Sequence, residues 1–95
     1  MEVFQSEIDS HSESFQANKT ATEQIISIFN DRISTVQKGG GAEAIEKHKS
    51  RGKLTARERI QGLIDPASSF LECSSLAAWE MYENQAPSAG VITGI

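Results

Sequence analysis

The stretch Lys47–Ile60, KHKSRGKLTARERI, combines a well-marked helix start with most of the positive charge of the chain. It holds six of the nine basic residues against a single acid, Glu58, and so carries a net charge of +5. Because the whole 95-residue chain carries −4, the remaining residues carry −9. Charge this localised invites an anionic ligand; the alternative is a solvated helix face that neutralises acidic neighbours.

A capping box predicts where a helix begins within this stretch. Thr55 and Glu58 stand three residues apart, so their side chains can satisfy free backbone N–H groups at a helix start. We therefore expect a helix from Ala56. Its buried side is expected to hold three aliphatic residues: Ile60, Leu63 and Ile64. Asp65-Pro66 should end it, because proline restricts the preceding residue away from helical geometry.

Two further helices are predicted on the amino-terminal side. Thr20-Ala21-Thr22-Glu23 is another capping-box pattern, so a helix should follow it and stop near Lys38, where three glycines can adopt left-handed conformations. Its buried stripe is expected to consist of five apolar residues: Ile25, Ile28, Phe29, Ile33 and Val36. Gly39–Gly41 indicates a linker rather than a phosphate-binding loop, because the GxxxxGK[ST] spacing is missing. Residues 42–49 can form a short second helix.

Short strand-like pieces are predicted after the third helix, at 70–73, 77–82 and 90–95. Cys73, in the first of them, is expected to be a buried structural thiol. The chain stops inside an apolar β-type run with no partner strand, and two or three short strands make a poor independent sheet. We therefore expect the sequence to be the front end of a larger protein, or a subunit that completes its sheet elsewhere.

The composition excludes several classes of protein. A pI near 5.1 argues against a general nucleic-acid binder. The single cysteine excludes an intramolecular disulfide, and His11 and His48 lack ligand-like spacing, so no metal site is predicted. The acidic N-terminus lacks a signal or transit pattern, and no apolar run approaches the roughly 20 residues that span a bilayer. We expect a cytoplasmic chain with no membrane partner.

No catalytic centre can be placed in this sequence, since a nucleophile elbow, a Ser/His/Asp set, a dinucleotide fingerprint and a P-loop are all missing. The candidate is instead a binding site for an anion, because helix starts bind anions. Lys53, Arg57 and Arg59 lie beside the expected start of the third helix at Ala56. The alternative is that Arg57 and Arg59 pair with acids on a neighbouring element. An aromatic group could stack on a ligand or anchor an interface, although packing is favoured: Trp79, Met81 and Tyr82.

Several motifs in order carry a family resemblance. The runs GGGAEAIEKHKSRGKLTARERIQGLIDPASSFLE and SSLAAWEMYENQAPSAGVITGI resemble the beginning of the carboxyltransferase (beta) subunit of biotin-dependent acyl-CoA carboxylases. GKLTARERI, Asp65-Pro66 and PSAGVITGI are the most specific parts. The MYENQAPSAGVITGI ending is similar to the 3-methylcrotonyl-CoA and geranyl-CoA branch rather than the propionyl-CoA branch.

The resemblance implies an α/β fold, in which N-terminal helices lead into the first strands of a crotonase-like (ClpP/crotonase) carboxyltransferase domain. It implies a ligase that transfers CO2 from carboxybiotin to an enoyl-CoA such as 3-methylcrotonyl-CoA, in leucine or isoprenoid catabolism. Biotin would be carried by a partner alpha subunit, the coenzyme A thioester would be the substrate, and the beta subunits would form a homo-oligomer.

The resemblance also implies how this chain is organised. The polar composition of residues 1–18 already indicates an arm that orders only against a partner or another part of a larger chain. The resemblance implies that residues 19–95 are the truncated start of the acyl-CoA carboxyltransferase N-terminal domain. The Gly-rich segments that hold the oxyanions would lie beyond Ile95, so this piece alone should be inactive. Charge and family together make four residues candidates for contacting coenzyme A phosphates: Arg51, Lys53, Arg57 and Arg59. The different-class alternative is a small helical interaction module whose basic patch docks an acidic partner or nucleic acid.

Overall fold

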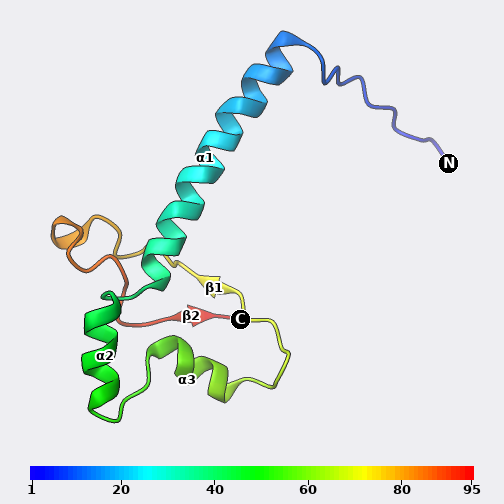
Figure 1. Ribbon diagram of the computed structural model, residues 1–95. Helices are drawn as coiled ribbons and strands as arrows, with labels where there is room; N and C mark the ends of the chain where they lie inside the picture. The colour runs from blue at the N-terminus through cyan, green and yellow to red at the C-terminus, as the bar shows by residue number, and fades with distance from the viewer. The chain divides into compact units, whose positions relative to one another are not determined.

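The computed structural model describes residues 1–95, which divide into two compact units, Met1–Asn30 and Asp31–Ile95. The elements in chain order are α1 (Glu13–Gln37), α2 (Ala42–Ser50), α3 (Ala56–Leu63), β1 (Glu72–Cys73), the 3-10 helix η1 (Met81–Asn84) and β2 (Thr93–Gly94) (Figure 1). The boundary between the units falls within α1. No helix combines the length and the apolarity that a membrane crossing requires.

α1 begins earlier than the sequence predicts. Ser12 precedes its first turn and accepts a 3.2 Å hydrogen bond from the Phe15 backbone N–H. The capping box predicted at Thr20 is wrong: the Thr20 hydroxyl donates to the Gln16 carbonyl at 3.0 Å, a bond made inside a continuous helix. α1 therefore starts within the segment predicted as an arm.

The apolar stripe of α1 is buried only at its carboxyl end. Val36 is the one fully buried side chain of the protein, with 1% of its surface exposed, and Ile33 is half-buried. Ile25, by contrast, is 68% exposed, and Ile28 and Phe29 are exposed as well. The prediction that the whole stripe is buried is wrong, because Met1–Asn30 contains no second helix or strand that could cover it.

The glycine-rich link between α1 and α2 behaves as predicted. Gly39 and Gly41 have φ angles of 58° and 93°, in the left-handed region where glycine carries no steric cost. α1 therefore ends at Gln37, and Gly41 stands at the N-cap of α2. α2 ends at Ser50, close to the predicted end at residue 49.

α3 begins at Ala56, as predicted, with a complete capping box. The Thr55 hydroxyl oxygen accepts from the Glu58 backbone N–H at 3.3 Å. In return, the Thr55 backbone N–H donates to Glu58 Oε2 at 2.8 Å. Two backbone N–H groups at the start of the helix are thus satisfied by side-chain oxygens of the same short segment.

Replacing Thr55 with Ala is expected to lower the free energy of unfolding by about 1 kcal/mol, because the Glu58 N–H loses its acceptor. Thr20→Ala is the matched control. Thr20 lies inside α1, where alanine is the better helix former, so that variant should be neutral or slightly stabilising. Urea denaturation of both variants checks this, and equal losses would contradict the different roles of the two threonines.

α3 ends at Leu63, ahead of Asp65-Pro66 as predicted. Ile60 and Ile64 are half-buried, which agrees with the predicted buried side. Leu63, however, is 86% exposed, so its predicted burial is wrong. Leu63 is three residues from Ile60, on the same side of the helix, so the helical period alone does not explain its exposure. Ile64 is the extended C-cap residue after α3, and the burial there is decided by the chain that follows the helix.

β1 and β2 form one antiparallel pair, whose register places Glu72 opposite Gly94. Leu71 and Ile95 extend the pairing with two reciprocal backbone hydrogen bonds, of 2.7 and 3.0 Å. A Cβ atom at Gly94 would overlap the Leu71 carbonyl and the Phe70 ring, so glycine permits this close approach. The last apolar run therefore has a partner strand, contrary to the prediction that it has none.

The segment between the two strands is not the strand predicted at 77–82. It forms turns and η1, where non-glycine residues such as Glu80 and Tyr82 have positive φ angles. Asn84 Oδ1 accepts from the Glu80 N–H at 3.0 Å, a local bond that competes with strand pairing. Cys73 is exposed, so its predicted burial is wrong: successive strand residues face opposite sides, and the half-buried side belongs to Glu72.

Candidate functional site

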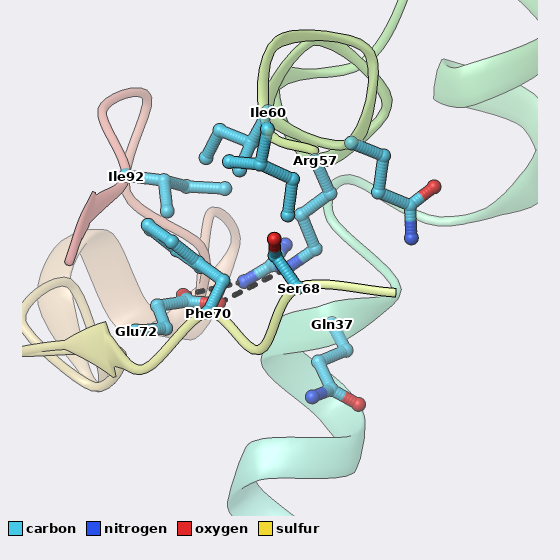
Figure 2. A pocket seen from close by; sticks show the side chains of 9 residues that line it. Gln37, Arg57, Ile60, Ser68, Phe70, Glu72 and Ile92 are labelled. Atoms are coloured by element: carbon cyan, nitrogen blue, oxygen red, sulfur yellow. Dashed lines mark hydrogen bonds and ion pairs between the residues drawn. The ribbon is translucent and has the colours of Figure 1, made fainter. Parts of the chain in front are cut away.

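An ion pair joins α3 to β1. Arg57 Nη2 donates to Glu72 Oε1 at 2.8 Å, and Arg57 Nε donates to Glu72 Oε2 at 3.3 Å. Figure 2 shows the two side chains pointing toward each other, with dashed lines marking their contact. The side chains are 28% and 21% exposed, so the two-pronged contact is partly shielded from water.

A pocket of about 310 Å³ lies beside this ion pair (Figure 2). Its apolar lining consists of four residues: Ile60, Ile64, Phe70 and Ile92. Gln37, Gln61 and Ser68 add polar side chains to the wall. Such a wall suits an apolar group that carries a hydrogen-bonding function. The Arg57 guanidinium also lines the pocket, but its charge is already neutralised by Glu72.

A second set of contacts fixes the turn between α2 and α3. A ring nitrogen of His48, Nε2, lies 2.8 Å from the Leu54 carbonyl oxygen and donates to it when it carries the proton. Lys49 Nζ pairs with Glu58 Oε1, while Glu58 Oε2 remains in the capping box with Thr55. The turn therefore has contacts from the end of α2 and from the start of α3.

The Lys49 ammonium group lowers the pKa of Glu58 from 4.5 to about 2, with the Thr55 backbone N–H as the second cause. Because the folded-state pKa is the lower one, this contribution to stability is complete above pH 4.5 and is lost as the pH falls toward 2. The carboxyl ¹³C shift of Glu58 should titrate near 2. In Lys49→Met the midpoint should rise, and an unchanged midpoint would contradict the assigned cause.

The four basic residues predicted as phosphate ligands divide into two groups. Arg57 is engaged by Glu72, which agrees with the alternative that it pairs with an acid on a neighbouring element. Arg51, Lys53 and Arg59 are exposed and make no ion pair. The structure thus places Arg51 and Lys53 together in the α2–α3 turn and Arg59 in α3, and it leaves these three cations available to an anion.

The aromatic group named from the sequence splits in a similar way. Trp79 is half-buried, and the Arg32 guanidinium lies 5.3 Å from the centre of its ring. Its indole N–H is buried without a hydrogen-bond partner. Met81 and Tyr82 are exposed. Trp79 therefore has the packing role that the sequence analysis favours.

The sequence does not reveal the roles of Glu72 and His48, two residues whose contacts organise the basic stretch. Glu72 is 15 residues from Arg57, and only its polar character within an apolar strand pattern hinted at a partner. The spacing of His48 argues only against a metal site, and its ring contacts the Leu54 backbone carbonyl. No three His, Cys, Asp or Glu side chains gather as a metal site would require.

Comparisons with known proteins give a consistent result. The family model described as "Carboxyl transferase domain" matches residues 47–95, from the start of the basic stretch to β2. The mitochondrial methylcrotonoyl-CoA carboxylase beta chain of Arabidopsis thaliana is 51% identical over 88 residues, which is 93% of this chain. A probable mitochondrial counterpart from Drosophila melanogaster is 45% identical over 98% of this chain.

A bacterial relative extends the comparison. The biotin-dependent 3-methylcrotonyl-coenzyme A carboxylase beta1 subunit of Mycobacterium tuberculosis is 44% identical over 76% of this chain. The chain spans only 15%, 16% and 14% of the lengths of these three relatives, in the order given.

Proposed function

Since the chain belongs to the carboxyl transferase domain family, we propose that it acts within the carboxyltransferase (beta) subunit of a biotin-dependent acyl-CoA carboxylase. The observation that carries this proposal is the identity to methylcrotonoyl-CoA carboxylase beta chains along nearly the whole chain. The reaction would transfer CO2 from carboxybiotin to 3-methylcrotonyl-CoA. The complete subunit would have the crotonase-like fold, with catalytic groups supplied by residues outside this sequence.

The partners follow from that reaction. A biotin-carrying alpha subunit would present the carboxylated cofactor, and the acyl-CoA would be the second substrate. Assembly of beta subunits with one another is a separate part of the proposal that the reaction itself does not require. We also propose a cytoplasmic location for the assembled enzyme. Measuring incorporation of labelled bicarbonate tests the proposal: kcat/KM should be highest with 3-methylcrotonyl-CoA, and a preference for propionyl-CoA would reject the substrate assignment.

Within this chain we propose that the three unpaired cations contact the phosphates of coenzyme A. Three basic residues are exposed and form no ion pair with a carboxylate: Arg51, Lys53 and Arg59. Phosphate groups accept charge-assisted hydrogen bonds from both guanidinium and ammonium groups. Arg57 is placed outside this set, since Glu72 already occupies two of its donors.

Each of Arg51→Ala, Lys53→Ala and Arg59→Ala is expected to raise the KM for acyl-CoA by about two- to fivefold, the range of an exposed ionic contact. kcat should change little, because phosphates far from the reacting carbon bind equally in ground and transition states. Lys38→Ala, which removes an exposed cation outside the basic stretch, is the control. Steady-state kinetics of the assembled carboxylase checks this, and an unchanged KM removes the residue from the site.

The exposed cations also keep the alternative of a basic docking module open. Titrations with coenzyme A and with an oligonucleotide, at several salt concentrations, distinguish the two functions. Binding of the oligonucleotide alone, with a steep salt dependence, would favour the docking module. Binding of coenzyme A with a weaker salt dependence would favour the carboxyltransferase.

A further inference from the structure

Contacts from both α2 and α3 fix the turn between these helices. The two cations in the turn, Arg51 and Lys53, make no ion pair within the protein. His48 on α2 contacts the Leu54 carbonyl, and Lys49 on α2 pairs with Glu58 on α3. Backbone bonds close the same turn, with the Gly52 N–H donating to the Lys49 carbonyl at 2.9 Å. Gly52 has a φ of 73°, which permits the sharp change of direction.

We propose that His48 and Glu58 are positioning residues, which hold the turn of residues 51–54 in the shape that presents Arg51 and Lys53 to a phosphate-bearing ligand. The inference rests on the function proposed above, in which that ligand is coenzyme A. We call His48, Lys49 and Glu58 the clamp. None of the three contacts the ligand in this proposal: they act through the shape of the turn.

The physical reason is conformational entropy. A mobile turn that carries two long cationic side chains would lose backbone and rotamer freedom when it closes on an anion, and that loss weakens binding. A turn that is already fixed loses less. The clamp places hydrogen bonds on both sides of the turn, while Arg51 and Lys53 themselves remain exposed and unpaired.

The charge of Glu58 allows its positioning role to be distinguished from its electrostatic repulsion of a phosphate, because the two effects predict opposite results. A carboxylate near a basic site repels a phosphate, so removing its charge by Glu58→Gln should tighten anion binding if Glu58 has no other role. If Glu58 positions the turn, the same substitution weakens binding, because Lys49 loses its partner. Glutamine can still complete a capping box, so α3 itself should persist.

The test measures the affinity of the 95-residue chain for coenzyme A by titration calorimetry, and the mobility of residues 51–54 by ¹⁵N relaxation. Glu46→Gln is the matched control, since Glu46 is an exposed acid on α2 without an ion pair. We expect the dissociation constant of Glu58→Gln for coenzyme A to be at least about threefold higher than that of this control, and residues 51–54 to be more mobile. His48→Ala should show the same two changes, and His48→Gln, which keeps a side-chain N–H donor, should restore the affinity.

Equal or tighter binding by Glu58→Gln than by Glu46→Gln would overturn the positioning role. Arg51→Ala and Lys53→Ala test the phosphate contact separately. If these variants weaken binding while the clamp variants do not, only the positioning inference fails. If neither weakens binding, or if pantetheine, which lacks the phosphates, binds as tightly as coenzyme A, the phosphate contact fails and the inference fails with it.

Discussion

Replacing Val36 with Ala is expected to lower the free energy of unfolding of the Asp31–Ile95 unit by about 2 kcal/mol. Val36 is the only fully buried side chain, at 1% exposure, so truncating it loses the burial of two methyl groups and leaves a cavity in their place. A loss of this size is a substantial fraction of the stability of any small domain. Urea denaturation followed by circular dichroism measures it.

Val91→Ala is the matched control for this prediction. It removes the same two methyl groups from a side chain that is 77% exposed, and it should change the free energy of unfolding by less than about 0.5 kcal/mol. Equal effects of the two substitutions would contradict the assignment of Val36 as the core of the unit.

Breaking the Arg57–Glu72 ion pair is expected to lower the free energy of unfolding by about 1–2 kcal/mol, as measured with Arg57→Met. The side chains are 28% and 21% exposed, so the pair lies between exposed pairs, which contribute about 0–1 kcal/mol, and buried ones. The remaining Glu72 carboxylate would lose both of its guanidinium donors in a partly desolvated site.

A double-mutant cycle with Glu72→Gln isolates the interaction, and a coupling energy of about 1 kcal/mol is expected. Arg59→Met is the control, because Arg59 is exposed and unpaired, and it should leave the stability nearly unchanged. A coupling energy near zero would mean that the contact contributes nothing beyond the two side chains acting independently. It would also remove the reason for setting Arg57 apart from the other three basic residues.

Elements whose signal is local were predictable. The start of α3 follows from the Thr55–Glu58 capping box, and the end of α1 follows from Gly39–Gly41. Each signal is strong because all of the interacting groups lie within a few residues of one another. The same kind of pattern was misleading at Thr20, since a hydroxyl inside a helix can donate to the carbonyl four residues earlier.

The candidate site was predictable only as a region. Composition located the basic stretch, and the motifs within it led to the family to which the chain belongs. Which cations remain free depends on carboxylates brought in by the fold. Glu72, 15 residues from Arg57 in the sequence, forms an ion pair with it, and Glu58 forms one with Lys49. Arg51 and Lys53, in the turn between α2 and α3, therefore remain unpaired.

The sequence by itself determined where the three helices end, where two of them begin, where the positive charge lies, and the family. These are properties of residue order, and they need no distant contact to be expressed. The tertiary structure alone decided that β1 pairs with β2, that Val36 is buried while Ile25 on the same stripe is not, and that Arg57 is neutralised. Burial and ion pairing depend on which distant groups meet, and periodicity along one helix carries no information about what covers it.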